Sequence, residues 1–83
     1  MQFTYKGKNV EIACAAGDTV KLYEVPESYS ADGFYAAVWR YGDVEPAPAC
    51  RGDAAFLLAH VTVQEDGDKL TAFGYMAEGV SYA

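Results

Sequence analysis

The sequence predicts a small, mainly β fold: an antiparallel meander of about six strands, closed into a barrel or folded into a two-layer sandwich. Apolar and polar residues alternate in several short segments, and turn-forming residues separate these segments at hairpin-like intervals. Aromatic residues make up 14% of the 83 residues, as is typical of strands. A chain of this length forms one domain, residues 1–83.

The first third of the chain predicts a hairpin and a third strand. Phe3 and Tyr5 alternate with polar residues, the sequence KGKN supplies a turn, and the alternation resumes at Val10. The sequence AAGD then interrupts the pattern before a third strand, TVKLYEV, which Pro26 ends. The following sequence, PESYSADG, predicts a loop.

Two segments in the middle of the chain are compatible with either a strand or a helix. As a strand, GFYAAVWRYG places Tyr35 and Trp39 on one face; as a helix, it covers 31–41. The sequence AAFLLAHVTV forms one long strand, or a short helix near 53–60 that Asp53 caps. Aromatic and β-branched residues favour strands in the first segment. The alternative fold class is therefore α+β.

The sequence HVTVQEDGDKLTAFGYM predicts a C-terminal hairpin. Asp66-Gly67 is a favoured pair for the two central residues of a type I′ turn. A turn at that position sets Val63 opposite Leu70 and leaves Glu65 facing Asp68 as like charges.

The charge balance excludes some classes of partner. Twelve acidic and six basic residues give a net charge of −6, with no cluster of Lys and Arg. Direct binding of nucleic acid or of an anionic membrane needs such clusters, so we expect neither. No apolar segment approaches the roughly 18 residues of a membrane span, and the first residues lack the apolar core of a secretory signal. These observations predict a soluble, cytoplasmic protein.

Neither the cysteines nor an adhesion-like tripeptide provides a clear site. Cys14 and Cys50 lack the paired spacing of metal or redox motifs, and we expect free, buried thiols, with a disulfide as the alternative. Arg51-Gly52-Asp53 matches the tripeptide of adhesive proteins, but two preceding prolines and the glycine are explained by a turn. We therefore expect a turn there.

The sequence gives little support for catalysis or metal binding. The only histidine, His60, lies within an apolar run, where a packed or edge histidine is the ordinary role. There is no phosphate-binding glycine loop, no nucleophile motif and no set of metal-ligand spacings. We expect no catalytic residues, no metal and no cofactor.

Tyrosine is the most informative residue type in this chain. Seven tyrosines and one tryptophan are more than a core of this size buries easily, so several should be exposed. Exposed tyrosines beside carboxylates are typical of a protein-binding face. The residues predicted to form this acidic, Tyr-rich face are Tyr35, Trp39, Tyr41, Asp43, Glu45, Glu65, Asp66, Asp68 and Tyr75.

The first hypothesis is therefore a non-catalytic protein-binding module whose partner has a basic surface. In its sharper form, the module inhibits a nucleic-acid-handling enzyme; small acidic proteins that block restriction or CRISPR complexes are similar to it in size and charge only. The alternatives are a small enzyme or ligand carrier that uses His60 and a cysteine, and a subunit of a homo-oligomer.

Overall fold

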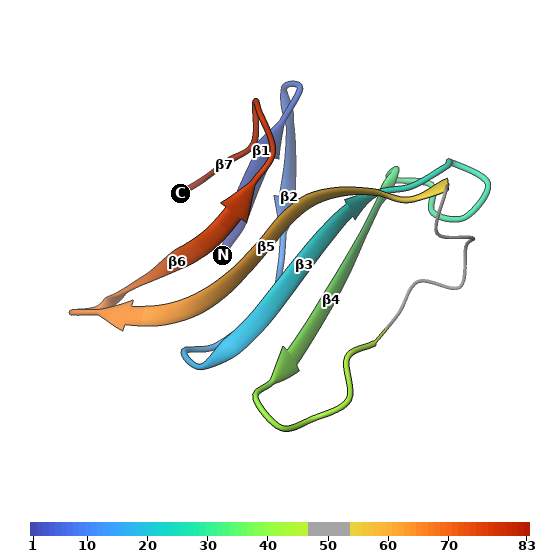
Figure 1. Ribbon diagram of the computed structural model, residues 1–83. Helices are drawn as coiled ribbons and strands as arrows, with labels where there is room; N and C mark the ends of the chain where they lie inside the picture. Colours follow the sequence, from blue (N-terminus) through green and yellow to red (C-terminus); the bar gives the residue numbers. More distant parts are fainter. Residues whose placement is uncertain (47–53) are drawn as a thin grey trace.

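The computed structural model describes residues 1–46 and 54–83 and consists of two antiparallel sheets (Figure 1). The strands are β1 (Gln2–Tyr5), β2 (Lys8–Glu11), β3 (Asp18–Glu24), β4 (Phe34–Arg40), β5 (Phe56–Asp66), β6 (Lys69–Met76) and β7 (Ser81–Tyr82). The smaller sheet has the order β2-β1-β7 and the larger sheet the order β4-β3-β5-β6. The predicted mainly β, two-layer fold is confirmed, and strands occupy both segments for which a helix was the alternative.

The core lies between the inner faces of the two sheets. Every second residue of β1, β3 and β5 points into it, as the alternation in the sequence predicts. The largest fully buried members are Phe3, Val20, Leu22, Leu58, Val61 and Val63. Each such side chain contributes about 1.5–3 kcal/mol relative to an exposed one, so this layer holds the two sheets together.

The β1–β2 hairpin closes through a two-residue turn at Lys6 and Gly7. Tyr5 pairs with Lys8, and the φ angles of Lys6 and Gly7 are +50° and +76°. Two positive φ angles are the signature of a type I′ turn, whose twist matches that of the flanking strands. The predicted hairpin is therefore present, and β2 starts within the segment expected to turn.

The predicted register of the β5–β6 hairpin is wrong by one position at the turn. The central residues are Gly67 and Asp68, because Asp66 pairs with Lys69 and Val63 pairs with Ala72. Only Gly67, at +66°, has a positive φ in this turn, as a type II′ turn requires at its first central position. This register replaces the expected pair of like charges by a pair of opposite charges, which is more favourable.

The larger sheet is built around β3, which pairs with β4 on one side and β5 on the other. The register between β3 and β5 shifts by one residue after Leu22: Leu22 pairs with Ala59, whereas Tyr23 pairs with Leu57. Leu58 is the extra residue of this bulge, and the bulge allows both Leu58 and Ala59 to be fully buried. Strict alternation would have exposed one of them.

The short strand β7 was not predicted from the sequence. It pairs with β1, and the Tyr82 ring lies 6.2 Å from the Phe3 ring. The Tyr82 hydroxyl donates to the carbonyl oxygen of Ala72 at 3.3 Å, which ties the smaller sheet to β6. The described residues contain no helix long and apolar enough to cross a membrane.

Candidate functional site

The face of the larger sheet that points away from the core carries a row of aromatic side chains. The register places Lys21 beside Ala37 and His60, and His60 beside Tyr75. The neighbouring row runs from Trp39 across two threonines to Phe73. We call this surface the outer face; its ring-bearing residues are Tyr23, Tyr35, Trp39, His60, Phe73 and Tyr75.

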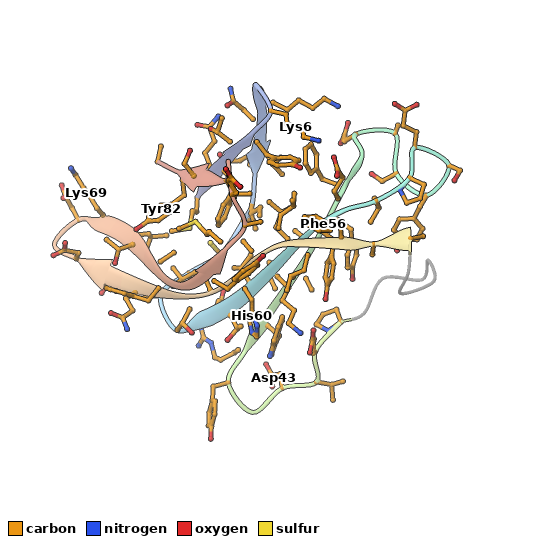
Figure 2. All side chains as sticks on the ribbon, turned by 45° about the horizontal axis from the view of Figure 1, so that its top comes forward. Lys6, Asp43, Phe56, His60, Lys69 and Tyr82 are labelled. Carbon is orange, nitrogen blue, oxygen red and sulfur yellow. The ribbon has the colours of Figure 1, made fainter. Side chains whose placement is uncertain are left out.

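No other strand of the described residues packs on the outer face, because the smaller sheet covers the opposite side. Phe73 and Tyr75 are 61% and 52% exposed. Figure 2 shows His60 and Lys6 on opposite sides of the larger sheet, with His60 on the outer face. Exposed apolar side chains that lie together on one sheet make this face a candidate binding surface.

Ring contacts order the aromatic side chains before any partner arrives. Trp39 and His60 have their ring centroids 6.3 Å apart, and Tyr23 and Tyr35 have theirs 6.2 Å apart. Tyr29, in the loop before β4, adds an edge-to-face contact with Tyr35 at 6.0 Å. The rotamers of this surface are therefore partly fixed, which reduces the entropy lost on binding.

Lys21 lies near the middle of the outer face and is bound by the loop that follows β4. Its Nζ donates to Oε1 of Glu45 at 2.8 Å and lies 5.9 Å from the centroid of the Trp39 ring. The hydrogen bond to Glu45 is the main reason that the pKa of Lys21 is raised above its ordinary value. The pair holds a carboxylate against the aromatic surface and neutralises the lysine.

The structure brings together only part of the predicted site. Tyr35, Trp39 and Tyr75 lie on the outer face, and Glu45 reaches it through Lys21. Tyr41 and Asp43 belong to the same loop as Glu45, and Tyr41 is 95% exposed. All of these residues except Tyr75 lie at the β4 side of the sheet, whereas Tyr75 lies on β6 at the opposite margin.

The other predicted carboxylates lie elsewhere. Glu65, Asp66 and Asp68 are at the tip of the β5–β6 hairpin, whereas Asp43 and Glu45 follow β4. Strands β4 and β6 are the two margins of the larger sheet, about 14 Å apart at the usual strand spacing (Figure 1). The predicted acidic face is therefore two separate groups of carboxylates.

Four residues of the outer face were missing from the predicted site: Lys21, Tyr23, His60 and Phe73. The alternation of β6 already places Phe73 on the same face as Tyr75, so Phe73 could have been assigned from the sequence. Placing Lys21 and His60 beside each other requires the pairing of β3 with β5, which no local pattern specifies.

The pairing of His60 with a cysteine, which the enzyme hypothesis needs, does not occur with Cys14. Cys14 is a half-buried free cysteine that packs against the core, whereas His60 projects from the outer face. Burial raises the pKa of the Cys14 thiol and so disfavours the reactive thiolate. Cys50 and the tripeptide at 51–53 lie outside the described residues.

The described residues contain no group of three or more His, Cys, Asp or Glu side chains that could hold a metal ion. No protein-family model, curated protein or solved structure matches the chain. Function must therefore be argued from the outer face itself.

Proposed function

We propose that this chain is a protein-binding module that engages its partner through the outer face of the β4-β3-β5-β6 sheet. The observation that carries the proposal is the row of aromatic side chains on a rigid sheet that no other described strand covers. Aromatic residues provide large contact areas with few rotatable bonds, which is why they dominate the energetic centres of protein interfaces.

The shape of this surface favours a macromolecule over a small ligand. Small-molecule sites are concave and enclose most of the ligand. Two pockets in the described residues lie between the two sheets and beside the β1–β2 hairpin, away from the outer face. An exposed aromatic surface that extends over four strands is instead the kind of surface that a protein partner binds.

The charge of the chain indicates what kind of partner fits. The net charge of −6 and the exposed carboxylate of Asp43 at the β4 margin favour a partner with a basic surface. Enzymes that handle nucleic acid carry such surfaces, so the sharper form of the proposal is an inhibitor that occupies their nucleic-acid groove. The same charge disfavours nucleic acid as the direct ligand.

The test is affinity capture from the host lysate, with elution in steps of rising salt and mass spectrometry of each step. A basic protein that handles nucleic acid and elutes at intermediate salt would support the sharper form, because salt screens the charge complementarity. Recovery of the chain alone, together with a concentration-dependent size, would replace the proposal by homo-oligomer formation through the same face.

Matched variants locate the surface responsible. We expect Trp39→Ala with Tyr75→Ala to abolish capture, since each side chain lies within the outer face. The control is Gln2→Ala with Thr4→Ala, two residues of β1 on the side of the smaller sheet that faces away from the core. Equal loss of capture with both pairs, or with neither, would contradict the proposal.

A further inference from the structure

A second surface lies where the margins of the two sheets face each other. Within the described residues, β2 and β4 each pair with a strand on one side only. The two strands line a common open groove of about 640 Å³, which all four residues of β2 border. The groove is separate from the outer face, because β4 contributes its core-facing residues Phe34 and Ala36 to it.

The register shows which backbone groups of β2 point into the groove. In an antiparallel hairpin with a two-residue turn, the residues that flank the turn exchange hydrogen bonds, and then every second pair does so. Tyr5–Lys8 and Phe3–Val10 are therefore hydrogen-bonded pairs, consistent with the 2.8 Å bond from the Ile12 N–H to the Met1 carbonyl oxygen. The N–H and C=O groups of the remaining residues, Asn9 and Glu11, point away from β1 and towards the groove.

The same reasoning applies to β4. The Val25 N–H donates to the Gly33 carbonyl oxygen at 2.9 Å, which fixes the alternation along the β3–β4 ladder. Phe34, Ala36 and Val38 therefore direct their N–H and C=O groups away from β3. Backbone groups of both margins thus point away from their own sheets, and no other described strand pairs with them.

The side chains around the groove define what kind of segment fits. Val10, Ile12, Phe34 and Ala36 provide an apolar floor that continues the core. Apolar residues at every second position of an extended segment would meet this floor, and the residues between them would face water.

Charge favours a basic segment. Glu11 and Asp32 border the groove, and Glu24 and Glu27 border the adjoining pocket, whereas Lys6 and Lys8 are the only bases at either. The N-terminal ammonium lies 3.4 Å from Oε1 of Glu11 and offsets part of this charge. The four acids against the two lysines and this ammonium leave one net negative charge, which complements Lys or Arg on an incoming strand.

We infer that the groove between β2 and β4 binds an extended segment of a partner protein. The segment adds as a strand to the margin of the sheet and places apolar side chains on the floor of the groove. It also carries Lys or Arg. The four residues of β2 span about 13 Å, so four or five residues of the segment pair along this margin. Lys8, whose Nζ lies 5.9 Å from the centroid of the Phe34 ring, crosses one end of the groove and moves aside. This inference does not rest on the outer face as a binding surface.

The experiment uses the full chain and a pool of nine-residue peptides with Val, Ile, Leu or Phe at the even positions and Thr, Ser, Lys or Arg at the others. Amide hydrogen exchange is measured residue by residue. In the free chain, the amides of Asn9, Glu11 and Ala36 should exchange rapidly, while those of Val10 and Ala37, bonded within the sheets, are protected. Peptide binding should slow the exchange of the first group.

Proline variants remove the N–H groups that face the groove and leave the existing ladders intact. We expect Glu11→Pro and Ala36→Pro each to weaken peptide binding about fivefold to tenfold. Leu70→Pro is the matched control, because the register directs the Leu70 N–H to the far margin of β6. Should a proline variant fail to fold, Ala36→Phe, which fills the floor and leaves the backbone unchanged, tests the same site.

The inference would be overturned if no peptide of the pool slowed amide exchange at residues 9, 11 and 36. Peptide binding that survives the variants at Glu11 and Ala36 would also overturn it. A third contradicting result would be protection of these amides that depends on the concentration of the chain alone. The last result would assign the groove to a second copy. The groove variants should lose peptide binding and still capture the partner of the outer face, and the outer-face variants should do the opposite. The failure of this inference can therefore be distinguished from the failure of the proposed function.

Discussion

Gly74 lies in the middle of β6, between the exposed rings of Phe73 and Tyr75, with a φ of +141°. A Cβ atom at this position would overlap the carbonyl oxygen of His60 and lie 3.0 Å from the Cα atom of Val61. The glycine therefore allows β6 to approach β5 closely where the two strands present their rings on the outer face. One residue without a side chain thus supports the geometry of its aromatic neighbours.

Gly74→Ala should destabilise the fold strongly. The overlap involves backbone atoms that cannot turn aside, and the φ angle is unfavourable for any side chain. We expect a loss of about 3 kcal/mol in the free energy of unfolding, measured by urea denaturation. Gly79→Ala is the control: its φ is +85° but its Cβ would meet open space, so about 1 kcal/mol should be lost. Equal effects at the two positions would contradict the close approach.

The pair of Lys21 and Glu45 gives a prediction with a defined pH dependence. Because the pKa of Lys21 is raised in the folded chain, the pair stabilises the fold below the ordinary lysine pKa, and the contribution disappears as the pH rises through the raised value. Glu45→Gln should therefore lower the free energy of unfolding by about 0.5 kcal/mol at neutral pH and by less at strongly alkaline pH.

The control for this variant is Glu78→Gln, which removes an exposed carboxylate from the turn before β7. Urea denaturation at both pH values, compared with the control, isolates the contribution of the pair. A cost of Glu45→Gln that persists unchanged at alkaline pH would show that Glu45 acts through something other than the charge of Lys21.

At the scale of the elements, strands and faces could be predicted from the sequence, but pairing could not. The alternation of Phe3 and Tyr5, or of Tyr35 and Trp39, assigns each strand and its buried side, because side chains of a strand alternate between two faces. Strand β7 has only two residues, too few for a periodic pattern. Its pairing with β1 depends on contacts between the two ends of the chain.

The β5–β6 hairpin shows why register was the weaker prediction. Asp66-Gly67 and Gly67-Asp68 are both favourable turn pairs, one for type I′ and the other for type II′. A shift of one position at the turn changes each partner by two residues and so leaves every side chain on its predicted face. Burial alone therefore does not distinguish the two registers, whereas the cross-strand pairing of Asp66 with the oppositely charged Lys69 favours the observed one.

A pair of substitutions in this turn tests the register. Gly67→Ala should cost about 1 kcal/mol, because Gly67 has a positive φ, whereas Asp68→Ala should cost less than about 0.5 kcal/mol. Thermal or urea unfolding of the two variants provides the comparison. A type I′ turn centred on Asp66-Gly67 would instead make Asp66→Ala costly, since residue 66 would then need a positive φ.

At the scale of the whole molecule, the aromatic residues are divided between the core and the outer face. The smaller sheet covers one side of the larger sheet and buries Phe3 and Tyr5, while Trp39, Phe73 and Tyr75 remain on the other side. Tyr35, Trp39 and Tyr75 could be predicted as part of this site from alternation and composition. The approach of Glu45 to Lys21 could not, since it depends on the path of a loop.

The acidity of the chain has a separate consequence at this scale. Carboxylates at the β4 margin and at the β5–β6 tip keep the net charge at −6, which limits self-association of the exposed aromatic surface. The same charge accelerates association with a basic partner at low salt. Salt screens both effects, so we expect partner binding and solubility both to decrease as the salt concentration rises.

The most direct test of the central claim is an NMR titration of the isotope-labelled chain with its captured partner. Trp39 is the only tryptophan, so its indole N–H gives one assignable signal on the outer face, beside His60. We expect this signal and the amide signals around His60 and Tyr75 to shift on binding, whereas the amide signal of Thr4 on the smaller sheet should not shift. Shifts confined to the smaller sheet, with an unchanged Trp39 signal, would contradict the assignment of the outer face as the binding surface.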